Sequence, residues 1–253
     1  MSELTARETA VAAKGPVGNL GGNWMTTPAE EAATLAAGMQ GWQLYFLGRH
    51  GVLGDVDADV ITASAFFFPP EVVRRDWEAA RALMTPDEAA RRYVALCHEW
   101  GRERLSGFDD AHRLAELARQ VADSADVAGL PLFAGWRAAV VPAEAPARCA
   151  HLMHVLREHR GACHGVAVVS HGLAPLTAVL ANQRGADNAE EYGWRGPFPD
   201  VTDADRALRH RVEEATDDLV AQAYAGLPPG ERAELLRLLT AAEQHAFPGG
   251  VVP

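Results

Sequence analysis

The sequence has a single lysine, only three cysteines and no long hydrophobic run. Clusters of lysine and arginine bind the phosphate backbone of DNA, so a formal net charge of -11 argues against nucleic acid as a partner. The cysteines form no CxxC pair, which is typical of reduced thiols in the cytoplasm. No apolar stretch reaches the roughly 20 residues of a membrane helix, and the first residues are acidic where a signal peptide is basic. We therefore expect a cytoplasmic protein without a membrane contact.

Several common catalytic motifs are also missing. The sequence contains no G-x-S-x-G, Walker A, G-x-G-x-x-G or clustered CxxC pattern. These absences exclude the usual hydrolase elbow, P-loop, dinucleotide-binding turn and zinc ribbon. Long alternating polar and apolar runs, which are typical of half-buried strands, are absent as well.

Signals for helix starts, in contrast, recur along the chain. Thr27-Pro28, Asp57 and Thr85-Pro86 each combine an N-cap residue with a proline or acidic residues in the first turn. Apolar residues then follow at helical spacing. We predict a mostly α-helical, multi-helix protein with at least eight helices and little or no sheet. Besides a histidine-rich helix after Pro146, the predicted helices cover about residues 27–38, 57–65, 70–83, 85–105, 110–127, 163–170, 175–183, 203–224 and 231–245.

Three segments are predicted to lie outside helices. Residues 48–55 hold three glycines and are expected to form a tight loop, either a turn between helices or a place where backbone approaches a ligand. Residues 130–137 are short and interrupted by glycine and proline, which indicates a buried connector. Residues 185–200 are acidic and rich in turn residues.

The chain divides by pattern into two parts. Residues 1–140 are predicted to form a helical N-terminal domain with an aromatic core, and residues 141–253 a helix-turn-helix-like C-terminal domain packed against it. The two short helices predicted around His171-Gly172-Leu173-Ala174 have small residues, Ala167 and Gly172, where that motif takes them. No third helix with a two-stranded wing follows. We therefore expect a degenerate winged-helix-like C-terminal half.

Several short motifs along the chain point to a known family. They are Gly48-Arg49 with Leu53-Gly54, Phe66 to Pro69, Leu156 to Gly161 with His164, Gly172-Leu173, and Glu213 to Asp217. On these motifs, the sequence over about residues 38–240 resembles an actinobacterial family of helix-turn-helix, MarR-like proteins. The resemblance implies a mostly helical, degenerate winged-helix architecture. The chain departs from the family pattern at Ala162 and Cys163, where the family has aspartate and glycine.

The segment from His151 to His164 holds four of the ten histidines of the chain. Imidazole ligates transition metals and titrates near neutral pH. On a helix, His151 and His154 share a face with Glu158, which suits a transition metal if another helix adds ligands. The spacing from His159 to Cys163 also occurs in some haem-binding helices. Solvated or core-packed histidines are the plain alternative, so the cofactor is left open.

The same segment permits acid–base chemistry without a metal. We take Glu158, His159, Arg160 and His164 as candidate catalytic residues. Glu158 would orient His159, or Arg160 would hold a carboxylate or phosphate while His164 moves a proton. In the structural alternative, Glu158 and Arg160 pair with each other in the protein interior.

Candidate ligand-binding residues lie in the N-terminal half. We expect Trp42, Arg49, His50 and Phe67 to reach a pocket lined or braced by the histidine-rich helix, with His50 as a further candidate for proton transfer.

Three classes of function fit these patterns. The first is a small-molecule-binding protein or cytoplasmic enzyme, for example of secondary metabolism, on a former DNA-binding scaffold. The second is a ligand-responsive transcriptional regulator that reads DNA through His171 to Arg184. The third is an interaction protein whose helices form a homodimer. The acidic charge and the missing wing favour the first.

Overall fold

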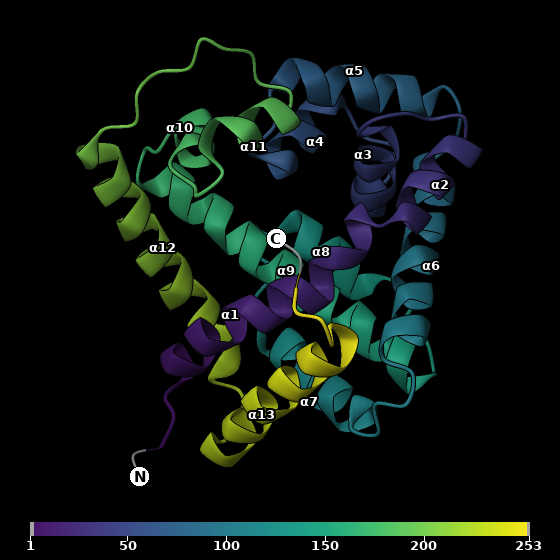
Figure 1. The fold of residues 1–253 in the computed structure, drawn as a ribbon, viewed down its shortest axis with the longest axis vertical. Helices are drawn as coiled ribbons and strands as arrows, with labels where there is room; N and C mark the ends of the chain where they lie inside the picture. Colours follow the sequence, from purple (N-terminus) through teal and green to yellow (C-terminus); the bar gives the residue numbers. More distant parts are fainter. Residues whose placement is uncertain (1–2, 252–253) are drawn as a thin grey trace.

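A computed structural model describes residues 3–251, which form helices around one long helix, α9 (Figure 1). No strand occurs in these residues, and the number of α-helices exceeds eight, so the prediction of a mostly α, multi-helix fold is confirmed. The elements are α1 (Ala6–Gly22), η1 (Asn23–Thr26), α2 (Pro28–Ala36), α3 (Gln43–His50), η2 (Gly51–Leu53), α4 (Ala58–Ala65), α5 (Pro70–Arg81), α6 (Pro86–Arg104), α7 (Ala111–Ser124), α8 (Pro131–Ala138), α9 (Ala145–Ser170), α10 (Pro175–Leu180), α11 (Gly185–Glu191), α12 (Asp203–Tyr224) and α13 (Pro229–Ala246).

The predicted helix starts at Thr27, Asp57 and Thr85 are confirmed. Each of these side chains accepts a hydrogen bond from a backbone N–H in the first turn of α2, α4 or α6. A helix leaves four such N–H groups without an intrahelical partner, and the cap satisfies one of them. The local sequence therefore fixes where these helices begin.

Helix α1 was not predicted, because Pro16 and four glycines fall within it. Its start is fixed by a capping box between Thr5 and Glu8. Gly21 lies so close to α9 that an added Cβ atom would be only 2.5 Å from the carbonyl oxygen of Met153. This glycine therefore serves the packing of two helices rather than a turn.

Two segments predicted as non-helical are helical, and those predictions were wrong. Residues 48–55 contribute the last turn of α3 and the 3-10 helix η2, where Gly48 packs against the Tyr93 side chain and Gly51 against the Pro86 backbone. Residues 130–137 form most of α8, which begins with Pro131 in its first turn. Gly135 gives α8 room against Val52. In both segments the glycines permit close packing of helices.

The predicted short helix at residues 163–170 is the end of α9, not a separate element. The chain turns at Gly172, which has the left-handed φ of +67° that glycine tolerates, and continues into α10. Residues 185–200 are not turns alone, since α11 occupies the first part. The structure shows no strand of a wing among residues 3–251.

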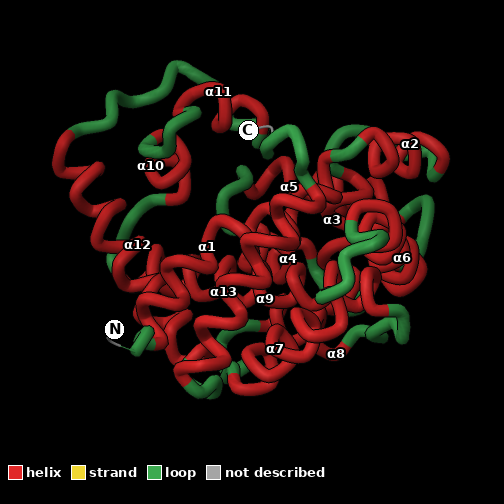
Figure 2. The backbone as a smooth tube through the Cα atoms, turned by 60° about the horizontal axis from the view of Figure 1, so that its bottom comes forward, coloured by secondary structure: helices red, strands yellow, loops and turns green. Residues whose placement is uncertain are grey.

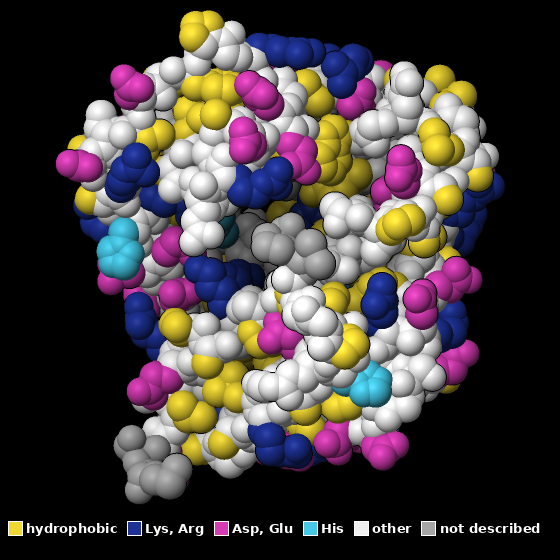
Figure 3. Space-filling view, in the orientation of Figure 1, with side chains coloured by type: hydrophobic (Ala, Val, Ile, Leu, Met, Phe, Trp, Pro, Cys, Tyr) yellow, Lys and Arg dark blue, Asp and Glu magenta, His cyan; other side chains and the backbone are white. Residues whose placement is uncertain are grey.

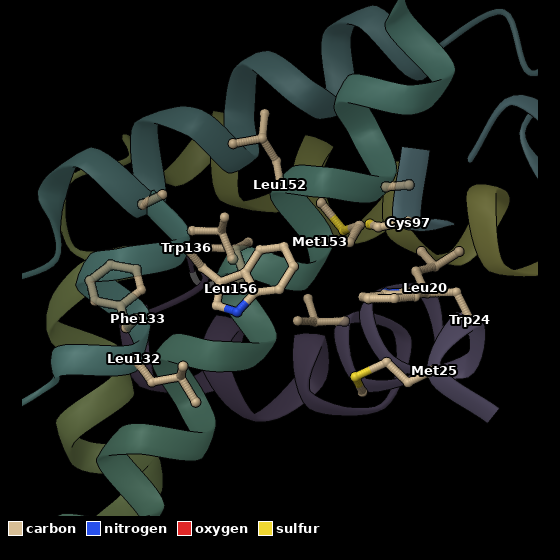
Figure 4. Packing of buried hydrophobic residues seen from close by; sticks show 14 of the residues in the cluster. Leu20, Trp24, Met25, Cys97, Leu132, Phe133, Trp136, Leu152, Met153 and Leu156 are labelled. Atoms are coloured by element: carbon tan, nitrogen blue, oxygen red, sulfur yellow. The ribbon is translucent and has the colours of Figure 1, made fainter. Parts of the chain in front are cut away.

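The largest hydrophobic cluster contains residues from both halves of the chain (Figure 4). Trp24 of η1, Trp136 of α8 and Met153 of α9 are fully buried in it. Two smaller clusters lie around α10, and Figure 2 shows α10, α11 and α12 at one side of the molecule. The division into domains at residue 140 stays a prediction. Within residues 3–251, no helix combines the length and apolar character needed to span a membrane.

Candidate functional site

A cavity of about 650 Å³ lies beside the second half of α9. Its other walls come from α1, α3, the turn between α4 and α5, the start of α8, α10 and α12. Figure 3 shows a hollow near the centre of the face drawn there, with Lys and Arg side chains at its border. Of the predicted site residues, Arg49, Phe67, Glu158, Arg160 and His164 line this cavity.

At one end of the cavity, Glu158 is bound by two arginines. Arg49 donates two hydrogen bonds to its carboxylate, at 3.0 Å to Oε1 and 2.8 Å to Oε2, and Arg157 donates a third at 2.8 Å. Burial alone would raise the pKa of Glu158, but Arg49, His154 and Arg157 outweigh it and hold that pKa well below its ordinary value. Glu158 is therefore ionised. The predicted pair between Glu158 and Arg160 was wrong, because Arg49 in α3 provides the buried partner.

A second charged cluster surrounds Glu213 of α12. Its carboxylate accepts hydrogen bonds from Lys14 of α1, from Arg160 of α9 at 3.1 Å, and from Arg209 one turn earlier on α12. Arg160 also pairs with Asp217 at 2.7 Å. Burial raises the pKa of Glu213, but the cations, Lys14 foremost, lower it to about 2. Helices α1, α9 and α12 thus bring their charged side chains together around Glu213.

His164 lies between this charged cluster and the aromatic wall. Burial lowers its pKa to about 4, with a further lowering by Arg209 and an opposing effect of Glu213. Because the guanidinium of Arg209 can only donate, it donates to Nε2 of His164 at 3.2 Å. The Nδ1–H group then donates to the Thr216 hydroxyl at 2.9 Å, and that hydroxyl donates to the Val212 carbonyl. At neutral pH His164 is therefore uncharged, with its proton on Nδ1.

Aromatic rings form a further wall of the cavity. Phe68 and Tyr192 stack with ring centroids 4.5 Å apart, and the Phe67 ring lies 5.5 Å from the His164 ring. Phe66 has a φ of 46°, a strained value for a bulky residue. Its ring packs against Gly165, which leaves no room for a Cβ atom. The packing of the Phe66 ring against α9 therefore holds this turn in place.

Three of the predicted catalytic and ligand-binding residues do not line the cavity. His159 is buried against Phe133 at 4.8 Å between ring centroids, where burial and then Arg137 lower its pKa to about 4. His50 is fully buried, with Nδ1 3.2 Å from the Phe46 carbonyl oxygen. Trp42 donates from Nε1 to the Glu191 carbonyl at 3.0 Å. These residues brace the walls rather than face the cavity.

The predicted metal ligands His151 and His154 are buried in the core. Nδ1 of His154 lies 2.7 Å from the Gly21 carbonyl oxygen, and Nδ1 of His151 lies 3.1 Å from Nε2 of His98. Among residues 3–251 no group of three or more His, Cys, Asp or Glu side chains is arranged to hold a metal ion. A metal at His151 and His154 stays a prediction. For haem, the His159 and Cys163 pair is turned into the protein core and presents no axial ligand to the cavity.

Sequence reasoning missed four charged residues of the cavity: Lys14, Arg157, Arg209 and Glu213 as a site residue. Lys14 and Glu213 are 199 positions apart and meet only because α1 and α12 both cross α9. The one signal available was the run from Glu213 to Asp217 in the family resemblance. Nothing in their local spacing links them to the histidine-rich segment.

The chain was compared with known protein families. The sequence model of a family described as a helix-turn-helix family matches residues 11–253. The chain belongs to this helix-turn-helix family. Comparisons with curated proteins and with solved structures gave no match. The segment predicted to be helix-turn-helix-like spans the end of α9, residues 171–174 and α10, and its role stays a prediction.

Proposed function

We propose that this helix-turn-helix family member binds a small molecule in the cavity beside α9. The observation that carries the proposal is a cavity of about 650 Å³ in which aromatic rings face convergent charged side chains. Small-molecule sites are concave, mostly apolar and provided with a few placed polar groups, at volumes of roughly 300–1,000 Å³. The five predicted residues that line the cavity supply both kinds of group.

An enzymatic role would rest on His164. An uncharged imidazole can accept a proton, but Nε2 of His164 already accepts a hydrogen bond from Arg209. Arg209 would have to move before a substrate could reach that nitrogen. Arg160 and Glu158 would then position the substrate, because both line the cavity and both are held by ion pairs.

Filling the cavity tests the proposal. Gly161 of α9 lines the cavity and has no atom within 4 Å of an added Cβ, so Gly161→Leu extends into the open space without a clash at the backbone. Gly230 of α13 is equally unhindered and lies outside the cavity lining, so Gly230→Leu is the matched control. Fluorescence of anilinonaphthalene sulfonate and of neutral N-phenylnaphthylamine measures binding.

We expect the native protein and Gly230→Leu to bind at least one of these probes at one saturable site. Gly161→Leu should lose that binding while retaining its helical circular dichroism. Unchanged probe binding in Gly161→Leu, or no saturable binding by the native protein, contradicts the proposal.

A ligand-responsive transcriptional regulator is the second candidate, and the family match favours it. Its DNA-reading element would be the segment from His171 to Arg184. The helix in this segment, α10, contains no lysine or arginine and has three of its six residues buried, and Arg184 follows it. That composition provides few phosphate contacts. Gel retardation with fragments of the source genome decides between the candidates: a band that survives competitor DNA supports the regulator, and its absence supports a role outside DNA binding.

A further inference from the structure

We propose that the ligand of the cavity is an organic anion with a flat, apolar body. Its carboxylate, phosphate or sulfonate end would bind at Arg209 and Arg160, and its body would lie on the wall formed by Phe66, Phe67 and Phe68. This inference rests on the proposed function and adds the chemical class of the ligand.

Charge is the first argument. Five cationic side chains line the cavity, whereas two carboxylates line it and a third, Asp217, pairs with Arg160 from behind. His164 is uncharged at neutral pH and does not change this balance. The cavity therefore has an excess of positive charge although the whole chain has a net charge of -11. The five cations are Lys14, Arg49, Arg157, Arg160 and Arg209.

The hydrogen-bond state of Arg209 is the second argument. Its side chain is mostly buried, and one Nη group is shared between Glu213 and His164. The Nε–H group is buried and has no hydrogen-bond partner among the described residues. A buried donor without a partner is costly, and a shift of the Arg209 side chain toward the cavity would bring Nε–H to an anionic oxygen, which would satisfy it with a charge-assisted bond.

The shape of the site is the third argument. The Phe67 ring lies against His164, whose Nε2 contacts Arg209, so the aromatic wall begins directly beside the cationic cluster. A ligand that places its anionic end at Arg209 therefore has its body on aromatic rings. Flat rings stack well on such a wall, and each aromatic contact adds about 0.5–1.5 kcal/mol beyond area burial.

Glu213 allows a test in which two substitutions should change anion binding in opposite directions. It occupies the cationic cluster as an internal anion, so it competes with the anionic end of a ligand. Arg209→Gln removes an attractive charge, whereas Glu213→Gln removes a repulsive one. The two positions lie one turn apart on α12; Glu213→Gln preserves side-chain size, whereas Arg209→Gln shortens the side chain and removes its charge. Lys14→Met is a third variant, since Lys14 is half-exposed and has Glu213 as its ion-pair partner. Arg91→Gln on the surface of α6 is the control.

Each protein is titrated with anionic anilinonaphthalene sulfonate and with neutral N-phenylnaphthylamine. We expect Arg209→Gln to weaken binding of the anion about tenfold, the loss of one charge-assisted hydrogen bond. Lys14→Met should weaken it less, and Glu213→Gln should strengthen it. Added salt should weaken binding of the anionic probe, but not of the neutral probe, to the native protein. This measurement does not depend on whether a variant folds. Arg91→Gln should change nothing.

Equal binding of both probes, with no difference between the variants and no effect of salt, overturns the anionic class but leaves the proposed ligand site intact. If the native protein binds neither probe at a saturable site, the proposed function itself is overturned. The two failures are thus distinguishable.

Discussion

Glu158 is a carboxylate with an exposed fraction of 1% whose two oxygens are both bound by arginine. Moving a charge into the protein interior is costly, and partners at hydrogen-bond distance offset that cost. The bond from Arg49 joins α3 to α9, and the two residues are 109 positions apart in the sequence. Removal of Arg49 takes two of the three arginine hydrogen bonds from the buried Glu158 carboxylate and leaves the one from Arg157.

We predict that Arg49→Met lowers the free energy of unfolding by about 3–5 kcal/mol, the cost of breaking a buried pair. The double substitution Arg49→Met with Glu158→Leu should restore a large part of this loss, because no buried charge remains. Urea unfolding followed by circular dichroism measures both. If the double variant is less stable than Arg49→Met alone, Glu158 does not depend on Arg49 for its compensation.

At the scale of elements, α1 and α9 approach each other through a glycine. An added Cβ on Gly21 would lie 2.5 Å from the Met153 carbonyl oxygen, and this neighbour is backbone that cannot rotate away. Gly18, one turn earlier on the same helix, has nothing within 4 Å of such an atom. The two positions therefore share helical backbone but differ in their surroundings.

We predict opposite effects of alanine at these positions. Gly18→Ala should stabilise the protein by about 0.4–1 kcal/mol, because the unfolded chain loses conformational freedom. Gly21→Ala should destabilise it by about 1–3 kcal/mol or more, because α1 has to move away from α9. Thermal unfolding of both variants gives the comparison. Equal effects at the two positions would mean that the contact between α1 and α9 yields easily.

The same glycines explain which elements the sequence predicts and which it conceals. Thr27, Asp57 and Thr85 mark helix starts because capping is a local interaction, readable from neighbouring residues. Gly21 and Gly48, in contrast, have the residue type of a turn but sit inside helices where another element comes close. Their role depends on contacts with distant residues, which a local pattern does not contain. Helix α1, the end of α3 and, because of Gly135, helix α8 were missed for this reason.

The candidate site divides in the same way. Glu158, Arg160 and His164 were found because they are dense within one helix. Their partners Arg49, Glu213 and Asp217 come from α3 and α12. The pairing of Glu158 with Arg49 rather than with Arg160 follows from helix geometry, because residues two positions apart on a helix do not face each other. Only the packing of whole helices reveals the cavity.

At the scale of the whole molecule, five histidines have mostly or fully buried side chains. Burial is the main cause that lowers their pKa values from the ordinary 6.5, to about 3 or about 4. The folded state therefore keeps them uncharged at a pH where the unfolded chain is protonated. The contribution of these histidines to the free energy of unfolding is fully present above about pH 6.5 and is lost as the pH falls toward 4. The five are His50, His151, His154, His159 and His164.

We predict that the free energy of unfolding decreases steeply between pH 6.5 and pH 4. His159→Leu removes one of these groups while keeping an apolar contact with Phe133. It should reduce the loss over this interval by up to about 3 kcal/mol, since one pKa unit corresponds to about 1.4 kcal/mol. His210→Gln on the exposed surface of α12 should keep the native pH dependence. Urea titrations at several pH values test this, and a flat profile for the native protein would contradict it.

Helix α9 is one unbroken rod of 26 residues whose first half is enclosed by the core and whose second half borders the cavity. Its amide hydrogens are therefore linked through one continuous ladder of backbone bonds. Occupancy of the cavity would slow amide exchange not only near Arg160 but also back toward Leu152, because the helix can open there only by giving up contacts at both ends. A compound held at a hundredfold excess over its Kd would add about 2.7 kcal/mol to the opening free energy of the whole rod.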